Sequence, residues 1–128
     1  MTDATNPAEP RIAMVTVDCA DPRAEAAFWS GLLGWQVAAE EDEYAMLIGP
    51  SNALGFGRVD GYQPPAWPNE HGSKQFHFDL ACDDIAATEA RCLELGATVA
   101  DPQGGDGWRV LLDPAGHPFC LTDAANWG

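Results

Sequence analysis

The segment FHFDLACDDIAATEARCLELGATV, residues 76–99, gives the clearest indication of the fold. Residues 76–81 alternate apolar and polar side chains, which is typical of a strand with one buried face. The acidic pair at 83–84 supplies a helix N-cap, and Gly96 is a typical residue for the end of that helix. Residues 97–99 then begin a second strand. The segment therefore predicts a strand, a helix and a further strand in that order.

The same order occurs about 63 residues earlier in the chain, where Cys19-Ala20-Asp21 corresponds to Cys82-Asp83-Asp84. Residues 12–18 predict the strand, Asp21-Pro22 the start of the helix, and Gly34 its end. The remaining predicted strands begin at 35–37 and cover 44–48 and 54–59 in the first half, and 108–112 and 117–122 in the second. Each half therefore has the pattern βαβββ.

This repeat defines the domain organisation. A single domain is expected over residues 11–123, made of modules at about 11–59 and 76–123 that are joined by a Pro- and Gly-rich crossing loop at 60–75. Residues 1–10 and 124–128 are expected to be tails. The predicted fold class is α+β, with the two modules forming a curved mixed sheet, or open barrel, around a cup-shaped cavity.

Composition excludes several classes of function. Six Lys and Arg against 20 Asp and Glu give a net charge of −14, which argues against nucleic-acid binding. The chain has no apolar run long enough to cross a membrane and no signal-peptide pattern at its start, so a cytoplasmic protein is expected. The four cysteines are scattered, without a C-x-x-C pair, and are expected to be reduced thiols.

Strand alternation places polar side chains together on the predicted sheet. Met14, Thr16 and Asp18 share one face of the first strand, and His77 and Asp79 share one face of the corresponding strand. The alternate residues are apolar and suit packing under the helices. A polar face on a curved sheet favours a ligand-binding cup. The alternative is an antiparallel sheet with one solvated side.

Three segments carry a resemblance to a known family: VDCADPRAEAAFWSGLLGW (17–35), HFDLACDDIAATEARCLELGATV (77–99) and LLDPAGHPFCLT (111–122). The sequence resembles the vicinal oxygen chelate superfamily of glyoxalases, bleomycin resistance proteins and dioxygenases, and especially its bacterial glyoxalase-like domain proteins. The resemblance implies an eight-stranded open barrel. In the superfamily's enzymes, four inward side chains hold a divalent metal ion.

Those four ligand positions are poorly kept in this sequence. By the resemblance they correspond to Met14, Gly57 (with Phe56 as its neighbour), His77 and Cys120. Only His77 is a usual ligand, so no cofactor is expected. A rearranged site of His77, Asp79 and Cys120 is the alternative, although Asp79 and His77 are far apart at their Cα atoms for one metal ion.

Other residues are candidates for ligand contacts, among them Phe56 beside the Gly57 position and Cys120 on the last predicted strand. His77 beside Asp79 is an arrangement suited to general acid–base catalysis. Trp67 in the crossing loop and Trp108 at a strand start provide aromatic surfaces for a planar ligand. Arg58 and Arg109 are each expected either to bind an anionic group of the ligand or to pair with a neighbouring carboxylate.

Two classes of function follow. The first is a metal-independent protein of the bleomycin-resistance type that binds a small hydrophobic or aromatic molecule. The second is a metal-dependent lyase like glyoxalase I, or an extradiol-type dioxygenase, that uses His77. The resemblance also implies a possible homodimer, because superfamily members often build their barrels from two chains. A monomeric barrel is equally compatible with this sequence.

Overall fold

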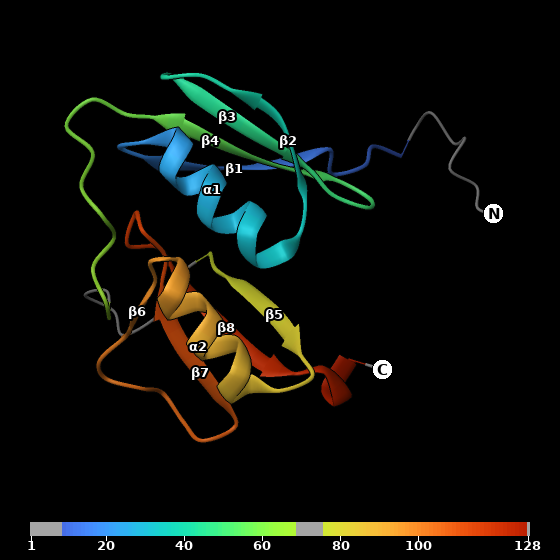
Figure 1. Ribbon diagram of the computed structural model, residues 1–128, viewed down its shortest axis with the longest axis vertical. Coiled ribbons are helices and arrows are strands. Elements are labelled where there is room, and N and C mark those ends of the chain that lie inside the picture. Colours follow the sequence, from blue (N-terminus) through green and yellow to red (C-terminus); the bar gives the residue numbers. More distant parts are fainter. Residues whose placement is uncertain (1–8, 69–75, 128) are drawn as a thin grey trace.

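The computed structural model describes residues 9–68 and 76–127 and contains both predicted βαβββ modules (Figure 1). Module 1 consists of β1 (Met14–Cys19), α1 (Pro22–Leu33), β2 (Gln36–Glu40), β3 (Tyr44–Ile48) and β4 (Ala53–Arg58). Module 2 consists of β5 (Phe78–Cys82), α2 (Ile85–Leu95), β6 (Thr98–Val99), β7 (Trp108–Leu112) and β8 (Pro118–Asp123). A short 3-10 helix, η1 (Ala124–Trp127), follows β8.

Both helices begin and end at the predicted residues. The Asp21 carboxylate caps α1 by accepting a 3.1 Å hydrogen bond from the Arg23 N–H, and Asp84 caps α2 in the same way. Gly34 and Gly96 follow the helices with φ of 74° and 116°, a left-handed conformation that glycine adopts without strain. Local sequence therefore determines the limits of both helices.

The strands form two four-stranded mixed sheets, ordered β1-β4-β3-β2 and β5-β8-β7-β6. In each module the first strand runs parallel to the last, and the other neighbours are antiparallel. The two sheets are hydrogen-bonded separately and do not close into a barrel. Within the described residues, β1 and β5 are therefore edge strands.

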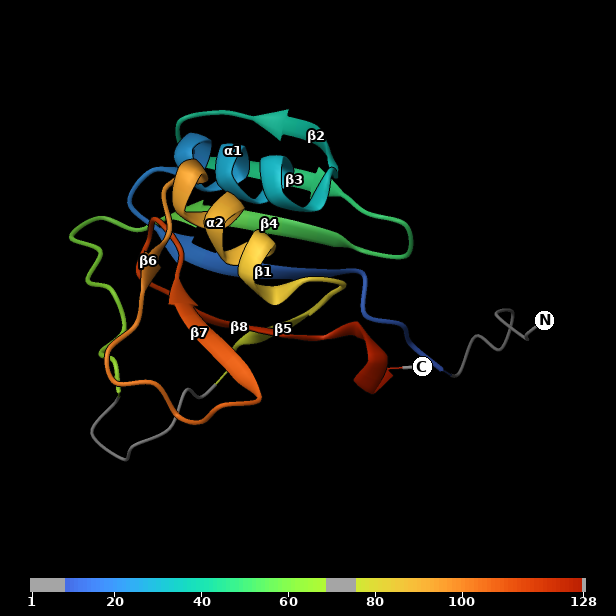
Figure 2. The same cartoon turned by 60° about the horizontal axis from the view of Figure 1, so that its bottom comes forward.

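The two modules share one hydrophobic core. Each helix packs on its own sheet, and α1 and α2 lie next to each other (Figures 1 and 2). Trp29 of α1 is 1% exposed, and its ring centroid lies 5.5 Å from Phe78 and 5.0 Å from Phe119 of module 2. These edge-to-face contacts bury aromatic surface from both modules and fix α1 against both sheets.

The C-terminal end of the domain is more ordered than a simple tail. Residues 124–127, expected as a tail, form η1, which packs beside β5, and Trp127 Nε1 donates a 2.7 Å hydrogen bond to Thr122 Oγ1. Residues 1–8 of the expected N-terminal tail and 69–75 of the crossing loop lie outside the described residues. Residues 60–68 contain no helix or strand. None of the described helices is long and apolar enough to span a bilayer.

Candidate functional site

Three potential ligand side chains meet on module 2. We call the face of each sheet that is turned away from its helix the far face. His77 directly precedes β5, Asp79 follows on the same side of the chain, and Cys120 of β8 is the register partner of Asp79. One ligand atom from each of the three residues lies within 4.8 Å of the other two. We refer to these residues as the His77 cluster.

The contacts within the His77 cluster explain why a large Cα spacing does not separate its side chains. His77 Nε2 lies 3.4 Å from Asp79 Oδ1, because both side chains lean toward each other from the same face. The His77 side chain is 24% exposed and Cys120 is 2% exposed, so the cluster extends from the solvent-exposed surface into the buried part of the sheet. The large Cα spacing between His77 and Asp79 therefore does not keep their donor atoms apart.

Aromatic side chains surround the His77 cluster. A cavity of about 250 Å³ lies over it, lined by His77, Asp79, Gly107, Trp108, Cys120, Thr122, Asn126 and Trp127. The Trp108 indole N–H is buried and has no hydrogen-bond partner within the described part of the chain. Trp127 reaches the cavity because η1 folds back beside β5. Its role is not visible in the sequence, where it resembles an ordinary terminal residue.

Trp67 also packs on the far face of module 2. Its ring contacts a small apolar cluster formed by Ala100, Val110 and Cys120, and its Nε1 donates a 3.0 Å hydrogen bond to the Pro102 carbonyl. The end of the described part of the crossing loop is therefore attached to module 2. Trp67 lies close to the candidate cavity without lining it.

The far face of module 1 is formed by small groups. The side chains of Met14 and Thr16 lie against Gly55. A Cβ atom built on Gly55 would be only 2.9 Å from Thr16 Oγ1 and 3.0 Å from Met14 Sδ. Met14 is 44% exposed. Gly57, the next position along this face of β4, has no side chain. The far face of module 1 is therefore shallow and accessible.

Phe56 is not on that far face. Its ring is 1% exposed and lies in the main core, beside its register partner Val17. Alternation along β4 turns Phe56 toward α1 and leaves Gly55 and Gly57 on the other side. The expectation that Phe56 contacts a ligand in the cup is corrected accordingly.

The two arginines are occupied by carboxylates. Arg109 makes two hydrogen bonds to Glu89 of α2, at 2.7 and 3.2 Å, and therefore points to the helix side of its sheet. Arg58 pairs with Glu43 at 3.2 Å and with Asp60 at 2.8 Å at the end of β4. The structure thus supports the carboxylate-pairing alternative for both and places neither in the candidate cavity.

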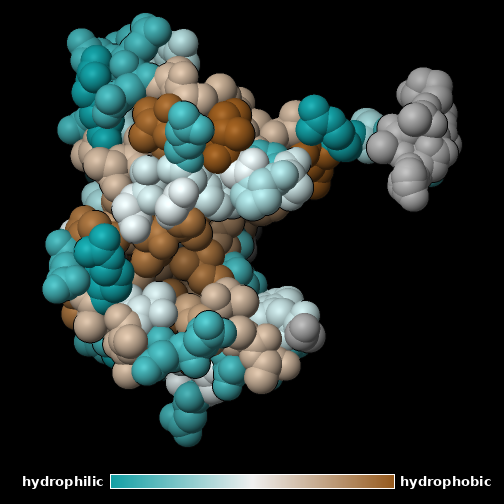
Figure 3. Space-filling view, turned by 45° about the vertical axis from the view of Figure 1, so that its right-hand side comes forward, coloured by the Kyte–Doolittle hydropathy of each residue, from teal (hydrophilic) through white to brown (hydrophobic). Residues whose placement is uncertain are grey.

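A second and larger cavity lies between the two sheets. It measures about 510 Å³ and brings Thr16 and His77 together, as the sequence predicts for a shared cup. Val15, Val17 and Phe78 are among its apolar lining residues, whereas strand alternation predicts that they pack under the helices. Figure 3 shows hydrophobic residues at the surface between the two modules on one side of the molecule. Since β1 and β5 are edge strands, residues from both of their faces reach this space. Phe76, which precedes β5, is fully exposed.

Asp18 is placed away from the His77 cluster. Its side chain is exposed, and its backbone carbonyl lies 2.7 Å from His117 Nε2. The described residues therefore bring together His77, Asp79, Cys120 and Trp108, and Thr16 and His77 both line the cavity between the sheets.

The superfamily's four-ligand metal site does not fit these residues. Met14 offers only a weak thioether donor, and Gly57 offers no side chain at all. His77 and Cys120 are suitable donors, and they lie together with Asp79 rather than with the module 1 positions. The donor set present in this chain is thus a different one, confined to module 2.

Two βαβββ modules with paired mixed sheets define the class: this chain has the fold of the glyoxalase/bleomycin resistance/dioxygenase, or vicinal oxygen chelate, superfamily. The sequence family described as "Glyoxalase-like domain" matches residues 14–122, and the chain belongs to that family. No curated protein is significantly similar to it in sequence.

Solved structures agree with this fold. A glyoxalase-related enzyme from Fulvimarina pelagi is 16% identical with a TM-score of 0.67, over 88% of this chain and 87% of that one. A glyoxalase/bleomycin resistance protein/dioxygenase family enzyme from Burkholderia phytofirmans PsJN is 18% identical with a TM-score of 0.64, over 90% and 99%. A lactoylglutathione lyase from Agrobacterium tumefaciens is 20% identical with a TM-score of 0.61, over 94% and 98%. At these identities the likeness concerns the fold alone.

Proposed function

We propose that this protein binds a small hydrophobic or aromatic molecule on the far face of module 2, in the manner of bleomycin resistance proteins and without a resident metal ion. One observation carries the proposal: a single cavity combines the His77–Asp79 pair with the rings of Trp108 and Trp127. Aromatic walls and a few convergent polar groups are the usual composition of a small-molecule site.

In this proposal the side chains of the cavity contribute to ligand binding in different ways. Asp79 lies 3.4 Å from the His77 ring and holds its orientation, so that His77 anchors a polar group of the ligand. The Trp108 indole nitrogen is buried, so Trp108 contributes ring surface to the cavity rather than a hydrogen-bond donor. The same His77–Asp79 pair is suited to proton exchange with a bound ligand. The broad surface of the rings supplies most of the affinity.

A second copy of the chain completes the site in this proposal. β1 is an edge strand of its sheet among the described residues, and an exposed sheet edge favours association. Met14 and Val15 on β1 are 44% and 37% exposed. A homodimer would cover these residues and place the shallow far face of module 1 opposite a module 2 cavity.

The alternative function is a metal-dependent lyase or dioxygenase, and one observation favours it. The donor atoms of His77, Asp79 and Cys120 lie within 4.8 Å of one another, and this N/O/S set is compatible with a zinc-like ion. Three protein ligands would leave a position for substrate oxygens, and the bound ion would supply Lewis-acid chemistry. The protein residues would in that case act as ligands, with Cys120 at the buried end.

Calorimetric titration of chelator-treated protein separates the two functions. Nickel, zinc, cobalt and, without oxygen, ferrous iron are titrated into the wild type and into His77→Ala. The proposal predicts no stoichiometric binding. Tight one-to-one binding that is lost in His77→Ala and kept in the control Asp83→Asn, an exposed carboxylate beyond the other end of β5, would establish the metal-dependent alternative.

A further inference from the structure

The cavity between the two sheets has no role in the proposed function, although it is larger than the cavity over the His77 cluster. It measures about 510 Å³, and cavities for drug-sized ligands measure about 300–1,000 Å³. Among the described residues, the two cavities have only His77 in common. The inner wall includes Trp29 and Pro118, which are buried, whereas Phe76 at the rim is fully exposed. The cavity therefore extends from solvent to the core between the modules.

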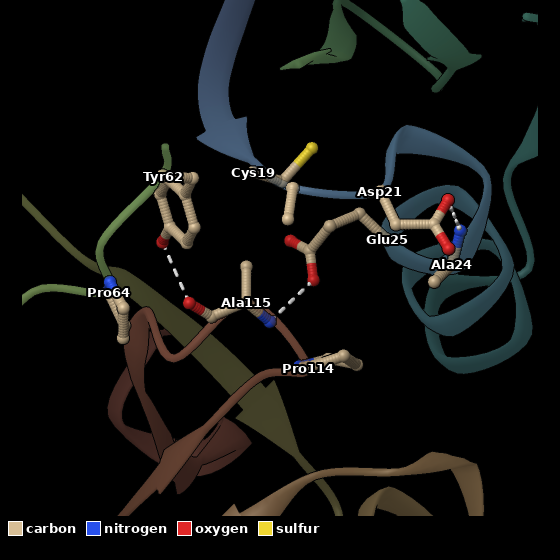
Figure 4. A pocket seen from close by; sticks show the side chains of 9 residues that line it. Cys19, Asp21, Ala24, Glu25, Tyr62, Pro64, Pro114 and Ala115 are labelled. Atoms are coloured by element: carbon tan, nitrogen blue, oxygen red, sulfur yellow. Dashed lines mark hydrogen bonds between the residues drawn. The ribbon is translucent and has the colours of Figure 1, made fainter. Parts of the chain in front are cut away.

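The hydrogen bonds of His117, which lines this cavity, determine its tautomer. Its Nε2 lies 2.7 Å from the Asp18 carbonyl oxygen and 3.2 Å from the Tyr62 hydroxyl. The Tyr62 hydroxyl donates its hydrogen to the Ala115 carbonyl at 2.7 Å (Figure 4), and the Asp18 carbonyl can only accept. Nε2 therefore carries the proton. In the neutral ring Nδ1 is then an acceptor, and no hydrogen bond among the described residues uses it.

The turn that carries His117 is held by several hydrogen bonds. Asp113 Oδ1 accepts from the Ala115 and His117 N–H groups, both at 2.9 Å. Glu25 of α1 accepts a 3.0 Å bond from the same Ala115 N–H (Figure 4). Because these bonds lie in a partly buried network, they hold the turn and the imidazole in one position. The Nδ1 acceptor is therefore presented from a rigid part of the fold.

The charge around the cavity disfavours anionic ligands. Burial, and then a hydrogen bond with Asp113, raise the pKa of Glu25 to about 9, so at neutral pH Glu25 holds a proton and Asp113 carries the negative charge of the pair. Asp113 is 5% exposed and lines the cavity. None of the Lys and Arg residues in the described ranges lines it. A neutral ligand is therefore favoured over an anion.

We propose that this cavity binds a neutral hydroxylated aromatic compound, a phenol or a naphthol, whose hydroxyl donates to His117 Nδ1 and whose ring packs on Val17 and Phe78. The hydroxyl supplies the hydrogen that a neutral imidazole acceptor can receive, and the apolar walls receive the ring. The Asp113 charge disfavours a carboxylate of the same size. This binding site does not depend on the function of the His77 cluster.

The probe for this proposal is 2-naphthol, compared with 2-methoxynaphthalene, which cannot donate a hydrogen bond, and with the anion 2-naphthoate. Titration at neutral pH, followed by two-dimensional NMR, is expected to show saturable shifts of the Val17 and His117 amides with 2-naphthol. We expect 2-methoxynaphthalene to bind at least ~10-fold more weakly, because it leaves Nδ1 without a donor. We expect 2-naphthoate not to bind. Shifts confined to β7 and η1 would place 2-naphthol over the His77 cluster and contradict the proposal.

His117→Phe tests the acceptor. The phenyl ring is similar in size to the imidazole and has no nitrogen, so 2-naphthol is expected to bind at least ~10-fold more weakly. Binding of 2-methoxynaphthalene is expected to stay as in the wild type, which separates loss of the acceptor from damage to the cavity. Equal weakening of both compounds would contradict recognition of the hydroxyl by His117.

Val15→Trp and Val37→Trp form a matched pair. Val15 lines the cavity and is 37% exposed on β1, whereas Val37 is 39% exposed on β2, at the opposite edge of the same sheet. Val15→Trp fills the cavity and is expected to abolish binding of 2-naphthol, and Val37→Trp is expected to bind it as the wild type does. Because Val15→Trp does not alter His117, it keeps the test decisive if His117→Phe does not fold.

The proposal is overturned if 2-naphthol does not bind the wild type, or if Val15→Trp and Val37→Trp bind it equally. Equal binding of 2-methoxynaphthalene and 2-naphthol to the wild type would contradict a hydroxyl site.

Discussion

The indole Nε1 of Trp29 lies 3.0 Å from Asp113 Oδ2, in a buried hydrogen bond between the helix of module 1 and the last turn of module 2. The same helix supplies Glu25, whose Oε1 accepts from the Ala115 N–H of that turn. The D-P-A-G turn at 113–116 therefore joins the two modules as well as linking β7 to β8. Mutations at this contact test how strongly the modules depend on each other.

Trp29→Phe is expected to lower the free energy of unfolding by about 2 kcal/mol or more, because a buried carboxylate loses its donor and the core loses volume. Urea unfolding measures the change. Trp35→Phe removes a similar volume from a partly buried ring on Gly49 and serves as the control. An equal loss in both variants would show that the Trp29–Asp113 bond contributes nothing specific.

The pH dependence of stability reports on Glu25. Its pKa rises from 4.5 to about 9 on folding, so the folded state holds a proton that the unfolded state releases. The stabilisation is therefore complete below about pH 4.5 and is lost as the pH rises to about 9. Glu25→Gln removes this pH-dependent contribution to stability and keeps an acceptor for the Ala115 N–H.

Thermal unfolding at pH 6 and pH 9 provides the measurement. The wild type is expected to lose at least ~5 °C more in Tm than Glu25→Gln between the two pH values. Asp42→Asn, at an exposed carboxylate whose partner is Arg23, controls for the change in net charge. Parallel changes in wild type and Glu25→Gln would show that Glu25 is ionised in the folded protein at pH 6.

His77 is expected to matter for binding more than for stability. Its side chain is partly exposed and lies at the start of an edge strand, so His77→Ala is expected to change the free energy of unfolding by less than about 1 kcal/mol. Chemical denaturation checks this value. A loss of several kcal/mol would make His77 a structural residue and remove it from the candidate site.

Much of the fold was predictable from local sequence. The capping residues Asp21 and Asp84 and the terminal glycines Gly34 and Gly96 act within one or two turns of the chain, so their spacing determines both helices. The repeat then predicts two equivalent modules. The observed strand limits differ from the predicted ones by one or two residues. For example, β5 begins at Phe78, whereas the sequence predicts a start at residue 76.

The site was less predictable because it depends on the directions of side chains and on packing between segments that are distant in sequence. Alternation correctly put His77 and Asp79 on one side, yet Phe56 and Arg109 were assigned without knowing which face of their strands meets a helix. From the sequence alone, the buried Glu25 is expected to be an ordinary solvent-exposed residue in the first turn of a helix. Glu25 is buried because the turn containing Ala115, which is distant in sequence, packs against it.

The central claim is that the far face of module 2 binds a small aromatic molecule through His77 without a metal ion. A fragment library of aromatic and heteroaromatic compounds, screened by two-dimensional NMR in the presence of chelator, tests it most directly. The account predicts compounds that shift the amides of β5, β7 and η1 and that bind His77→Ala at least ~10-fold more weakly. Binding that occurs only after a stoichiometric divalent metal ion is added would contradict it.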